Sequence, residues 1–304
     1  MFALIAPGQG AQAPGMLEPW IQDPSAKLLV QQWSHEIALD LIRLGTTADA
    51  EEIKDTANAQ PLIVAAGLLG ARALNKGNNF GFVAGHSVGE ITAAALAGVI
   101  SDIDAMKLVR ARGIEMAKAA AITPAGMAAV FGGDREVVLR AIEDLGLVAA
   151  NDNGAGQIVA AGDLDALAQL APEGARVRAL AVAGAFHTSY MESAVSPLRT
   201  LAASLEVQDS KCGVISNKDG AVIRNGREIL ERIVAQISNP VRWDLCMTTL
   251  AENVSGALEV PPAGTLVGLL KRAVPIVETF ALKSVADISL ADEFALRHNQ
   301  EVSN

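Results

Sequence analysis

Two kinds of hydrophobic pattern alternate along this chain: short apolar runs typical of buried strands, and longer segments typical of helices. Short continuous apolar runs at residues 2–6, 80–84, 257–260 and 276–282 predict buried strands. Between them, segments such as residues 61–74 have the length and composition of helices. Strands that alternate with helices indicate an α/β fold built on a mainly parallel sheet.

A different order of elements interrupts this alternation between residues 124 and 187. Strands are predicted at residues 127–131, 147–151, 157–161 and 176–182, and helices at 135–145 and 164–170. The order strand, helix, strand, strand, helix, strand is that of a ferredoxin-like unit. Because the α/β pattern continues on both sides, we expect this unit to be inserted into a hydrolase-like core.

The expected division of the chain follows from this insertion. Residues 1–123 and 188–290 form the hydrolase-like large subdomain, and residues 124–187 form the ferredoxin-like small subdomain, with a cleft between the two. The short and increasingly polar stretch at residues 291–304 predicts a frayed C-terminal tail.

Composition narrows the function classes. The 304 residues are 51% hydrophobic and 19% charged, enough for a substantial core. No basic leader or apolar segment of about 18 residues is present, so we expect a cytoplasmic protein with no membrane partner.

The formal charge of -10 disfavours nucleic acid as a partner. Two cysteines, Cys212 and Cys246, are too few for a metal cluster and lack a second ligand at metal spacing, so we expect no metal. We also expect no cofactor. Nothing demands more than a monomer.

The most informative motif is Gly-His-Ser-Val-Gly-Glu at residues 85–90. It contains the G-x-S-x-G pattern of a nucleophile elbow, in which a sharp turn between a strand and a helix exposes a serine. The apolar run at residues 80–84 and a helical stretch at residues 88–97 supply that context. We therefore expect Ser87 to be a nucleophile, with no room for a Cβ at Gly85 or Gly89.

A serine needs a base, and the chain has four histidines. His35, in a polar helical stretch, and His298, in the tail, are expected at the solvated surface. His86 adjoins the serine but points in a different direction, so it is expected to pack beside the elbow. His187, where the insert returns to the core, is the best candidate base.

An arginine interrupts the apolar face of the next predicted helix, which starts at Ser101 in capping-box fashion. Arg112 falls on the same face as Leu108 and Met116 and is expected to point inward. A buried guanidinium needs an acceptor, either a protein carboxylate such as Glu90 or the carboxylate of a substrate. Arginine suits the second role because its planar fork donates two parallel hydrogen bonds.

Together these residues resemble one family, the malonyl-CoA:acyl carrier protein transacylases and the related acyltransferase domains of fatty acid and polyketide synthases. The resemblance spans nearly the whole chain. It rests on the loop at residues 7–10, the elbow, the helix of Arg112 and Met116, residues 151–157, Phe186-His187, and residues 236–243. The chain departs from the family at Ala11, Thr188 and residues 259–264.

The resemblance implies a role for each matching residue. Ser87 takes a malonyl group from malonyl-CoA while His187 accepts its proton, and the backbone N–H groups of Val88 and Gln9 bind the oxyanion. A backbone carbonyl at Gln236 orients His187, which makes a Ser-His dyad. The malonyl group then passes from Ser87 to the phosphopantetheine thiol of acyl carrier protein, in ping-pong order.

The resemblance also implies the pocket and the partner. His86, Met116, Phe186 and Asn153 line the substrate pocket, Arg112 holds the malonyl carboxylate, and the ring of Phe186 disfavours methylmalonyl. The carrier is acidic, so basic side chains near the mouth are expected to dock it. The product is expected to feed fatty acid synthesis, and polyketide synthesis where the cell supplies carriers for it. The alternative is a serine hydrolase or thioesterase acting on acyl-CoA, although such enzymes usually place an acid between serine and histidine.

Overall fold

The computed structural model describes residues 1–75, 79–182 and 184–300 of the chain. Its larger sheet has six strands in the order β11-β10-β1-β2-β7-β8. All neighbouring strands in this sheet run parallel except β7 and β8, so the α/β class is confirmed. The strands are β1 (Phe2–Ala6), β2 (Phe82–Gly85), β7 (Gly213–Ile215), β8 (Val222–Ile223), β10 (Gly256–Glu259) and β11 (Glu278–Ala281).

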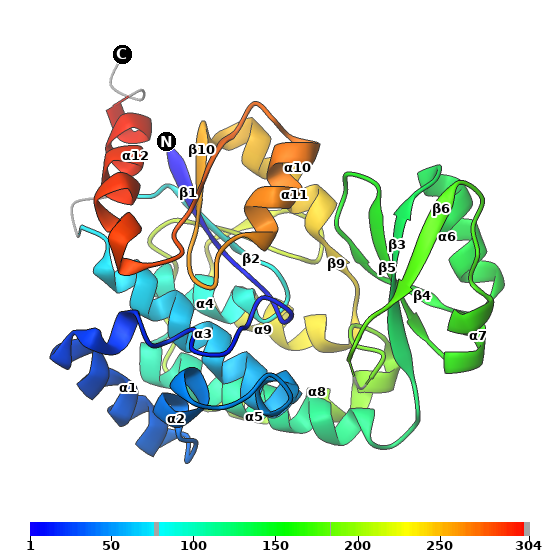
Figure 1. The fold of residues 1–304 in the computed structure, drawn as a ribbon, viewed down its shortest axis with the longest axis horizontal. Coiled ribbons are helices and arrows are strands. Elements are labelled where there is room, and N and C mark those ends of the chain that lie inside the picture. Colours follow the sequence, from blue (N-terminus) through cyan, green and yellow to red (C-terminus); the bar gives the residue numbers. More distant parts are fainter. Residues whose placement is uncertain (76–78, 183, 301–304) are drawn as a thin grey trace.

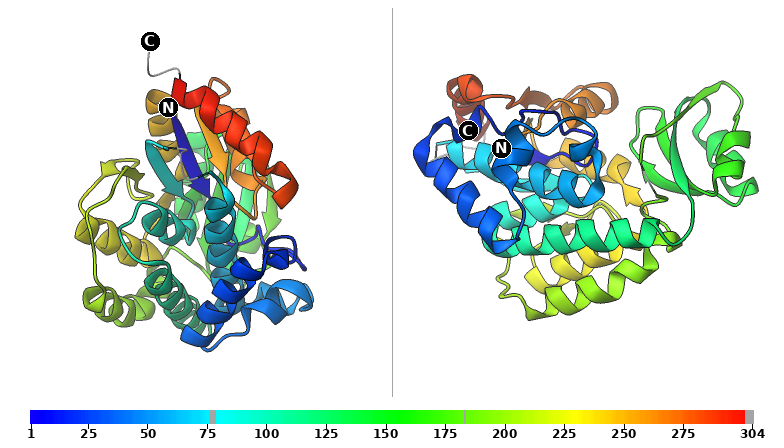
Figure 2. Two further views of the ribbon diagram at one scale, coloured as in Figure 1. Left: turned by 90° about the vertical axis from the view of Figure 1, so that its left-hand side faces the viewer. Right: turned by 60° about the horizontal axis from the view of Figure 1, so that its bottom comes forward.

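Helices surround this sheet (Figures 1 and 2). Those that precede the small part are α1 (Pro24–Glu36), α2 (Leu41–Thr46), α3 (Thr56–Ala73), α4 (Gly89–Leu96) and α5 (Asp102–Ala120). Those that follow it are α8 (Glu192–Ser204), α9 (Gly226–Ala235), α10 (Trp243–Asn253), α11 (Thr265–Ala273) and α12 (Ile288–Gln300).

The burial of strand β1 shows that the sheet is covered on both faces. All five of its residues are buried, as expected of a central parallel strand. Alternate side chains point to opposite faces: Phe2 and Leu4 belong to the core beneath α3 and α4, whereas Ala3 and Ile5 belong to the core beneath α10 and α11. The first core also takes in Phe294 of α12.

The small part lies to one side of the large sheet (Figure 1). Its elements are β3 (Gly126–Gly132), α6 (Arg135–Asp144), β4 (Val148–Asp152), β5 (Gln157–Gly162), α7 (Leu164–Gln169) and β6 (Ala175–Ala179). The predicted order of strands and helices is therefore confirmed. The sheet order is β6-β3-β5-β4-β9, with antiparallel pairing throughout except between β4 and β9.

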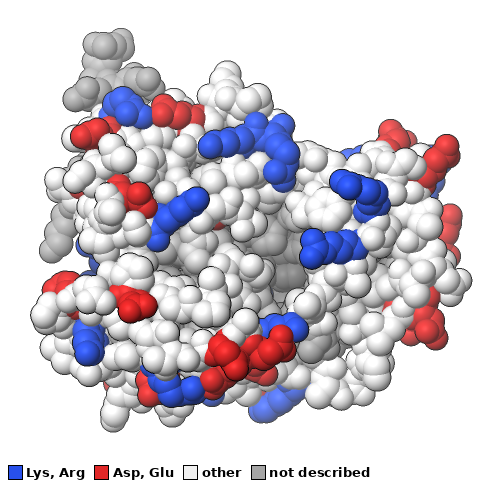
Figure 3. All heavy atoms as spheres, viewed as in Figure 1, with Lys and Arg blue, Asp and Glu red and all other residues white. Residues whose placement is uncertain are grey.

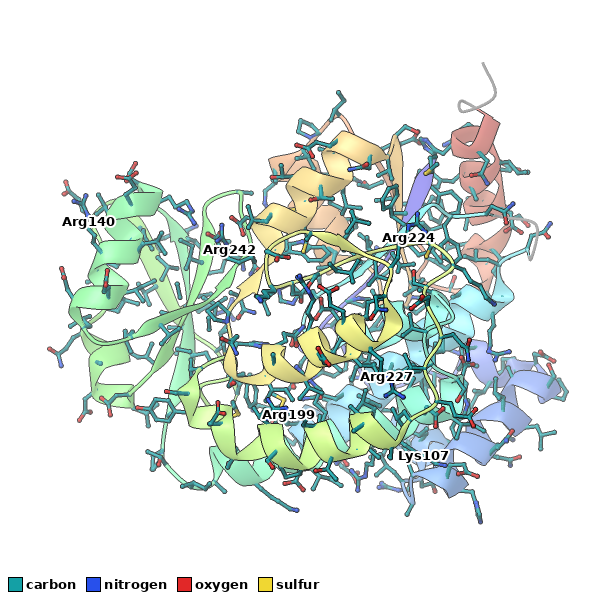
Figure 4. The ribbon with its side chains drawn as sticks, turned by 180° about the vertical axis from the view of Figure 1, so that it is seen from behind. Lys107, Arg140, Arg199, Arg224, Arg227 and Arg242 are labelled. Carbon is teal, nitrogen blue, oxygen red and sulfur yellow. The ribbon has the colours of Figure 1, made fainter. Side chains whose placement is uncertain are left out.

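The fifth strand of the small sheet was not expected. Strand β9 (Val241–Arg242) comes from the second segment of the large part and pairs in parallel with β4. Figure 4 shows Arg242 at this junction, whereas Arg140 lies on the outer helix α6. The two parts are thus joined by a third stretch of chain in addition to the two ends of the small part.

Three expectations about the C-terminal region are wrong. The frayed tail is a helix to Gln300, because Phe294 and Ala295 fill the core against β1 and β10; residues 301–304 lie outside the described residues. His298 is only 4% exposed and lies 2.7 Å from the hydroxyl of Ser255. The strand expected at residues 276–282 is present as β11 (Glu278–Ala281), but it lies at the edge of the sheet and is not buried as expected; Ile276, just before it, is 82% exposed. The polarity of residues 291–300 did not reveal that this helix packs against the sheet.

No helix in the described ranges is both long and apolar enough to cross a membrane.

Candidate active site

Ser87 lies at the turn between β2 and α4, as the elbow motif predicts. Its backbone φ is 53°, in the left-handed region that residues with a Cβ rarely adopt. The turn is tight: a Cβ added to Gly85 would lie 2.0 Å from the backbone carbon of Gly89, and one added to Gly89 would lie 2.2 Å from the carbonyl oxygen of Ala6. Gly89 therefore packs against β1, and both glycines are required by sterics.

His187 is brought to the serine by the tertiary fold. Its Nε2 lies 2.8 Å from the hydroxyl of Ser87, and its Nδ1 lies 2.8 Å from the backbone carbonyl of Gln236. Because a carbonyl only accepts, Nδ1 carries the proton and Nε2 is free to accept one. Burial, helped by the charge of Arg112, lowers the pKa of His187 to about 3, which keeps the ring neutral at pH 7.

Arg112 lies in the interior beside this pair, 1% exposed. Its guanidinium donates to the side-chain oxygens of Gln60, at 2.7 Å, and Gln236, at 2.9 Å, and to the hydroxyl of Ser87, at 3.2 Å. Burial lowers its pKa to about 10, so it remains charged at pH 7. Among the described residues, no carboxylate lies within 4 Å of it.

One of the two expected acceptors for Arg112 was Glu90. The structure shows that Glu90 is not a direct ion-pair partner of Arg112. The amide of Gln236 lies between them: its nitrogen donates to Glu90 at 2.5 Å, and its oxygen accepts from Arg112. Burial raises the pKa of Glu90 to about 7. The positive charge of Arg112 thus meets neutral oxygens, and an anionic ligand could replace them.

The other expected pocket residues surround these three. His86 packs its ring edge-on against Trp243, and its Nε2 lies 2.8 Å from Oδ1 of Asn153. Met116 is buried, and its sulfur accepts from the amide of Gln60 at 3.6 Å. Phe186 is 6% exposed.

The loop that precedes α1 comes close to the elbow. A Cβ added to Gly8 would lie 2.8 Å from the carbonyl oxygen of His86, so Gln9 follows directly on this contact. The side chain of Gln9 donates to Thr56 at 3.2 Å. Val88, the residue after the nucleophile, is fully buried at the start of α4.

A cavity of about 350 Å³ joins most of these residues and lies between the two parts. Figure 3 shows this face of the molecule hollowed between them. The residues that line the cavity and were expected in the site are Gln9, His86, Ser87, Arg112, Met116, Asn153, Phe186 and His187. Val88 and Gln236 are not among the lining residues: Val88 follows Ser87, and Gln236 contacts His187 and Arg112. No group of three or more His, Cys, Asp or Glu side chains within the described ranges is arranged to hold a metal ion.

Two residues that hydrogen-bond to Arg112 or to Ser87 were missed from the sequence. Gln60 lies in the interior of α3 and supplies one acceptor to Arg112. Asn217 follows β7 and contacts the backbone of Ser87. The only available signal was a polar residue next to an apolar run, which occurs at many other positions of this chain. A helix or strand pattern cannot say which of them faces a buried cation.

An elbow serine paired with a neutral histidine, in a cavity that also holds a buried arginine, is an arrangement suited to acyl transfer through a serine ester. Residues 3–290 match the family model described as acyl transferase domain. The chain belongs to this family and, within it, to the malonyl CoA-acyl carrier protein transacylases; it is an acyltransferase.

Three relatives illustrate the similarity. The malonyl CoA-acyl carrier protein transacylase of Mycobacterium tuberculosis strain H37Rv is 52% identical, with 97% of this chain and 99% of the relative covered. The crystal structure of MCAT from Mycobacterium tuberculosis has a TM-score of 0.92 at 51% identity, with 96% and 99% covered. A complex of a type II PKS acyl-carrier protein with its malonyl-transacylase matches with a TM-score of 0.90 at 30% identity, with 96% and 99% covered.

Proposed function

We propose that this enzyme moves the malonyl group of malonyl-CoA to the phosphopantetheine thiol of acyl carrier protein through a malonyl ester on Ser87. One observation carries the proposal: the hydroxyl of Ser87 lies 2.8 Å from Nε2 of His187 and 3.2 Å from the guanidinium of Arg112. The nucleophilic oxygen of Ser87 thus contacts both a base and a group that can bind a carboxylate.

In the first half-reaction, Ser87 Oγ attacks the thioester carbonyl carbon and its proton passes to Nε2 of His187. The N–H groups of Val88 and Gln9 bind the oxyanion that forms on the carbonyl oxygen. When the carbon–sulfur bond breaks, the proton on Nε2 passes to the sulfur, and coenzyme A leaves as the thiol. The carbonyl of Gln236 holds the imidazolium in place throughout.

In the second half-reaction, the phosphopantetheine thiol enters the emptied cavity and gives its proton to His187. Its sulfur attacks the ester carbonyl, and Ser87 leaves with that proton. The order is ping-pong because both acyl carriers use the same cavity.

The acyl group is selected at two points. The malonyl carboxylate binds the guanidinium of Arg112 in place of the neutral amide oxygens, which acetyl cannot do. The ring of Phe186 leaves little room for a methyl branch, so methylmalonyl is disfavoured.

The carrier reaches the cavity at its rim. Helix α11 lines the cavity with Leu266 and Leu269 and ends in the exposed residues Lys271 and Arg272. Positive charge at this rim suits an acidic carrier protein. The carriers served are those of fatty acid synthesis, and those of polyketide synthesis where the cell makes them.

The architectural part of the proposal is a hydrolase-like core with an inserted ferredoxin-like subdomain. The strand order β6-β3-β5-β4, in which the last strand of the unit lies beside the first, supports it. The hydrolase alternative is weaker because Nδ1 of His187 faces a carbonyl and not a carboxylate. We regard the enzyme as a cytoplasmic monomer.

Intact-protein mass spectrometry tests the proposal. After brief exposure to malonyl-CoA, the protein should gain one malonyl group, and added phosphopantetheinylated carrier should remove it. Ser87→Ala should gain none, whereas Ser193→Ala, which changes an exposed serine on α8, should behave as wild type. Release of coenzyme A without an adduct or transfer to the carrier would instead identify a hydrolase.

A further inference from the structure

Asn217 lies beside the turn that carries Ser87, just beyond the end of β7. Strand β7 pairs with β2 up to Ala84 and Ile215. Two residues further, the side chain of Asn217 donates to the carbonyl of Gly85 at 2.7 Å and accepts from the N–H of Ser87 at 2.8 Å. A carboxamide carries the donor and acceptor of a peptide group, so this side chain extends the ladder past the end of the strand.

The turn needs this support because of its backbone conformation. Ser87 has a φ of 53°, which the surrounding structure must enforce on a residue with a Cβ. Asn217 hydrogen-bonds to the residues before and after His86, Gly85 and Ser87, and is itself fully buried. If its two hydrogen bonds were lost, the turn could relax and move Oγ away from His187. A displacement of about 1 Å from a productive geometry costs on the order of 100-fold in rate.

The orientation of the Asn217 amide is fixed in turn by Glu90. The carboxylate accepts from the backbone N–H of Asn217 at 2.6 Å and from the amide nitrogen of Gln236 at 2.5 Å. Because the guanidinium of Arg112 only donates, the oxygen of Gln236 must face it, which directs the nitrogen of Gln236 toward Glu90. That nitrogen also donates to Oδ1 of Asn217 at 3.1 Å, so Oδ1 is the end that faces Ser87.

We propose that Asn217 is a positioning residue for the nucleophile: its carboxamide holds the turn of Ser87 in the attacking geometry, and Glu90 fixes the orientation of that carboxamide. The proposal rests on the proposed function, because its readout is acylation of Ser87. It concerns the rate of attack and not the binding of the acyl group, since Arg112 lines the cavity and Asn217 does not.

The experiment measures single-turnover acylation by malonyl-CoA and by acetyl-CoA, with intact mass giving the fraction of protein that reacts. Asn217→Ala removes both hydrogen bonds, each worth about two- to tenfold. The acylation rate at saturation should therefore fall by about 4- to 100-fold. The concentration for half-maximal rate should stay within about threefold of wild type, and both acyl groups should lose the same factor. A role in stability alone would lower the reactive fraction and leave the rate of the remaining protein unchanged.

Thr92→Val is the matched control. Thr92 is buried on the helix that begins at the elbow, and its hydroxyl has no hydrogen-bond partner among the described residues. This variant should acylate within about threefold of wild type. If Asn217→Ala does not fold, Glu90→Gln takes its place: it leaves Asn217 intact, releases its orientation, and should slow acylation about tenfold.

The outcomes separate the two proposals. If wild type forms no malonyl adduct, the proposed function fails and the role of Asn217 fails with it. If wild type is acylated and a folded Asn217→Ala, or Glu90→Gln in its place, reacts at the wild-type rate, only the role of Asn217 is overturned. A change confined to the half-saturating concentration also overturns it.

Discussion

Replacing Arg112 with alanine should abolish the preference for malonyl over acetyl while leaving the nucleophile and base in place. Arg112 is 1% exposed and meets only neutral oxygens among the described residues, so its charge is available for a substrate carboxylate. Acetyl-CoA lacks that carboxylate. The change therefore removes an interaction that only one of the two substrates makes.

The size of the effect follows from the burial. Truncating one partner of a buried, hydrogen-bonded charge pair costs about 2–5 kcal/mol. At about 1.36 kcal/mol per tenfold, kcat/KM for malonyl-CoA should fall by roughly 30- to 5000-fold. For acetyl-CoA we expect a change of less than about tenfold, since it loses only the hydrogen bond from the guanidinium to Ser87 Oγ.

The assay compares the rates at which the Ser87 adduct forms from the two thioesters, and the measured quantity is their ratio. Losses common to both substrates, such as partial misfolding, cancel in this ratio. Arg110→Ala is the matched control: Arg110 lies two residues before Arg112 on α5, is half-buried and donates to the carbonyl of Ala57, so its loss should leave the ratio unchanged. A ratio in Arg112→Ala within threefold of wild type would falsify the carboxylate assignment.

Three further predictions concern the rest of the site. Phe186→Ser should improve methylmalonyl-CoA relative to malonyl-CoA by about 10- to 200-fold in a competition assay, the range for one methyl group; an unchanged ratio would show that the ring has no selective role. Gly85→Ala should unfold at a much lower temperature or fail to fold, because its Cβ would meet the backbone of Gly89. Gly268→Ala, in the open interior of α11, should gain about 0.5–1 kcal/mol, and similar melting of the two variants would contradict the steric argument. The pKa of His187 is lowered to about 3, so the unfolded chain binds a proton below pH 6.5 that the folded chain does not. Between pH 6.5 and 4, the free energy of unfolding should therefore fall with decreasing pH more steeply in wild type than in His187→Ala, by up to about 1.4 kcal/mol per pH unit, as chemical denaturation can measure; parallel curves would show that the ring titrates normally.

Local sequence determined the elements that carry the chemistry. The elbow at Ser87 could be predicted because its turn restricts two nearby positions to glycine, and because a strand and a helix must flank it. The order of elements in the small part follows from the spacing of its apolar runs. His187 emerged by elimination among four histidines, and the inward face of Arg112 followed from helical periodicity.

Only the tertiary structure decided what these residues meet. Asn217 lies 130 positions from Ser87 in the sequence, and Gln60 lies 52 positions from Arg112, so no local pattern connects either pair. The same holds for β9 in the small sheet and for α12, whose polar sequence concealed the few apolar side chains that anchor it. Periodicity indicates which face of an element is buried. The partner on that face is chosen by the packing of distant segments, because side-chain hydrogen bonds depend on positions within a few tenths of an ångström.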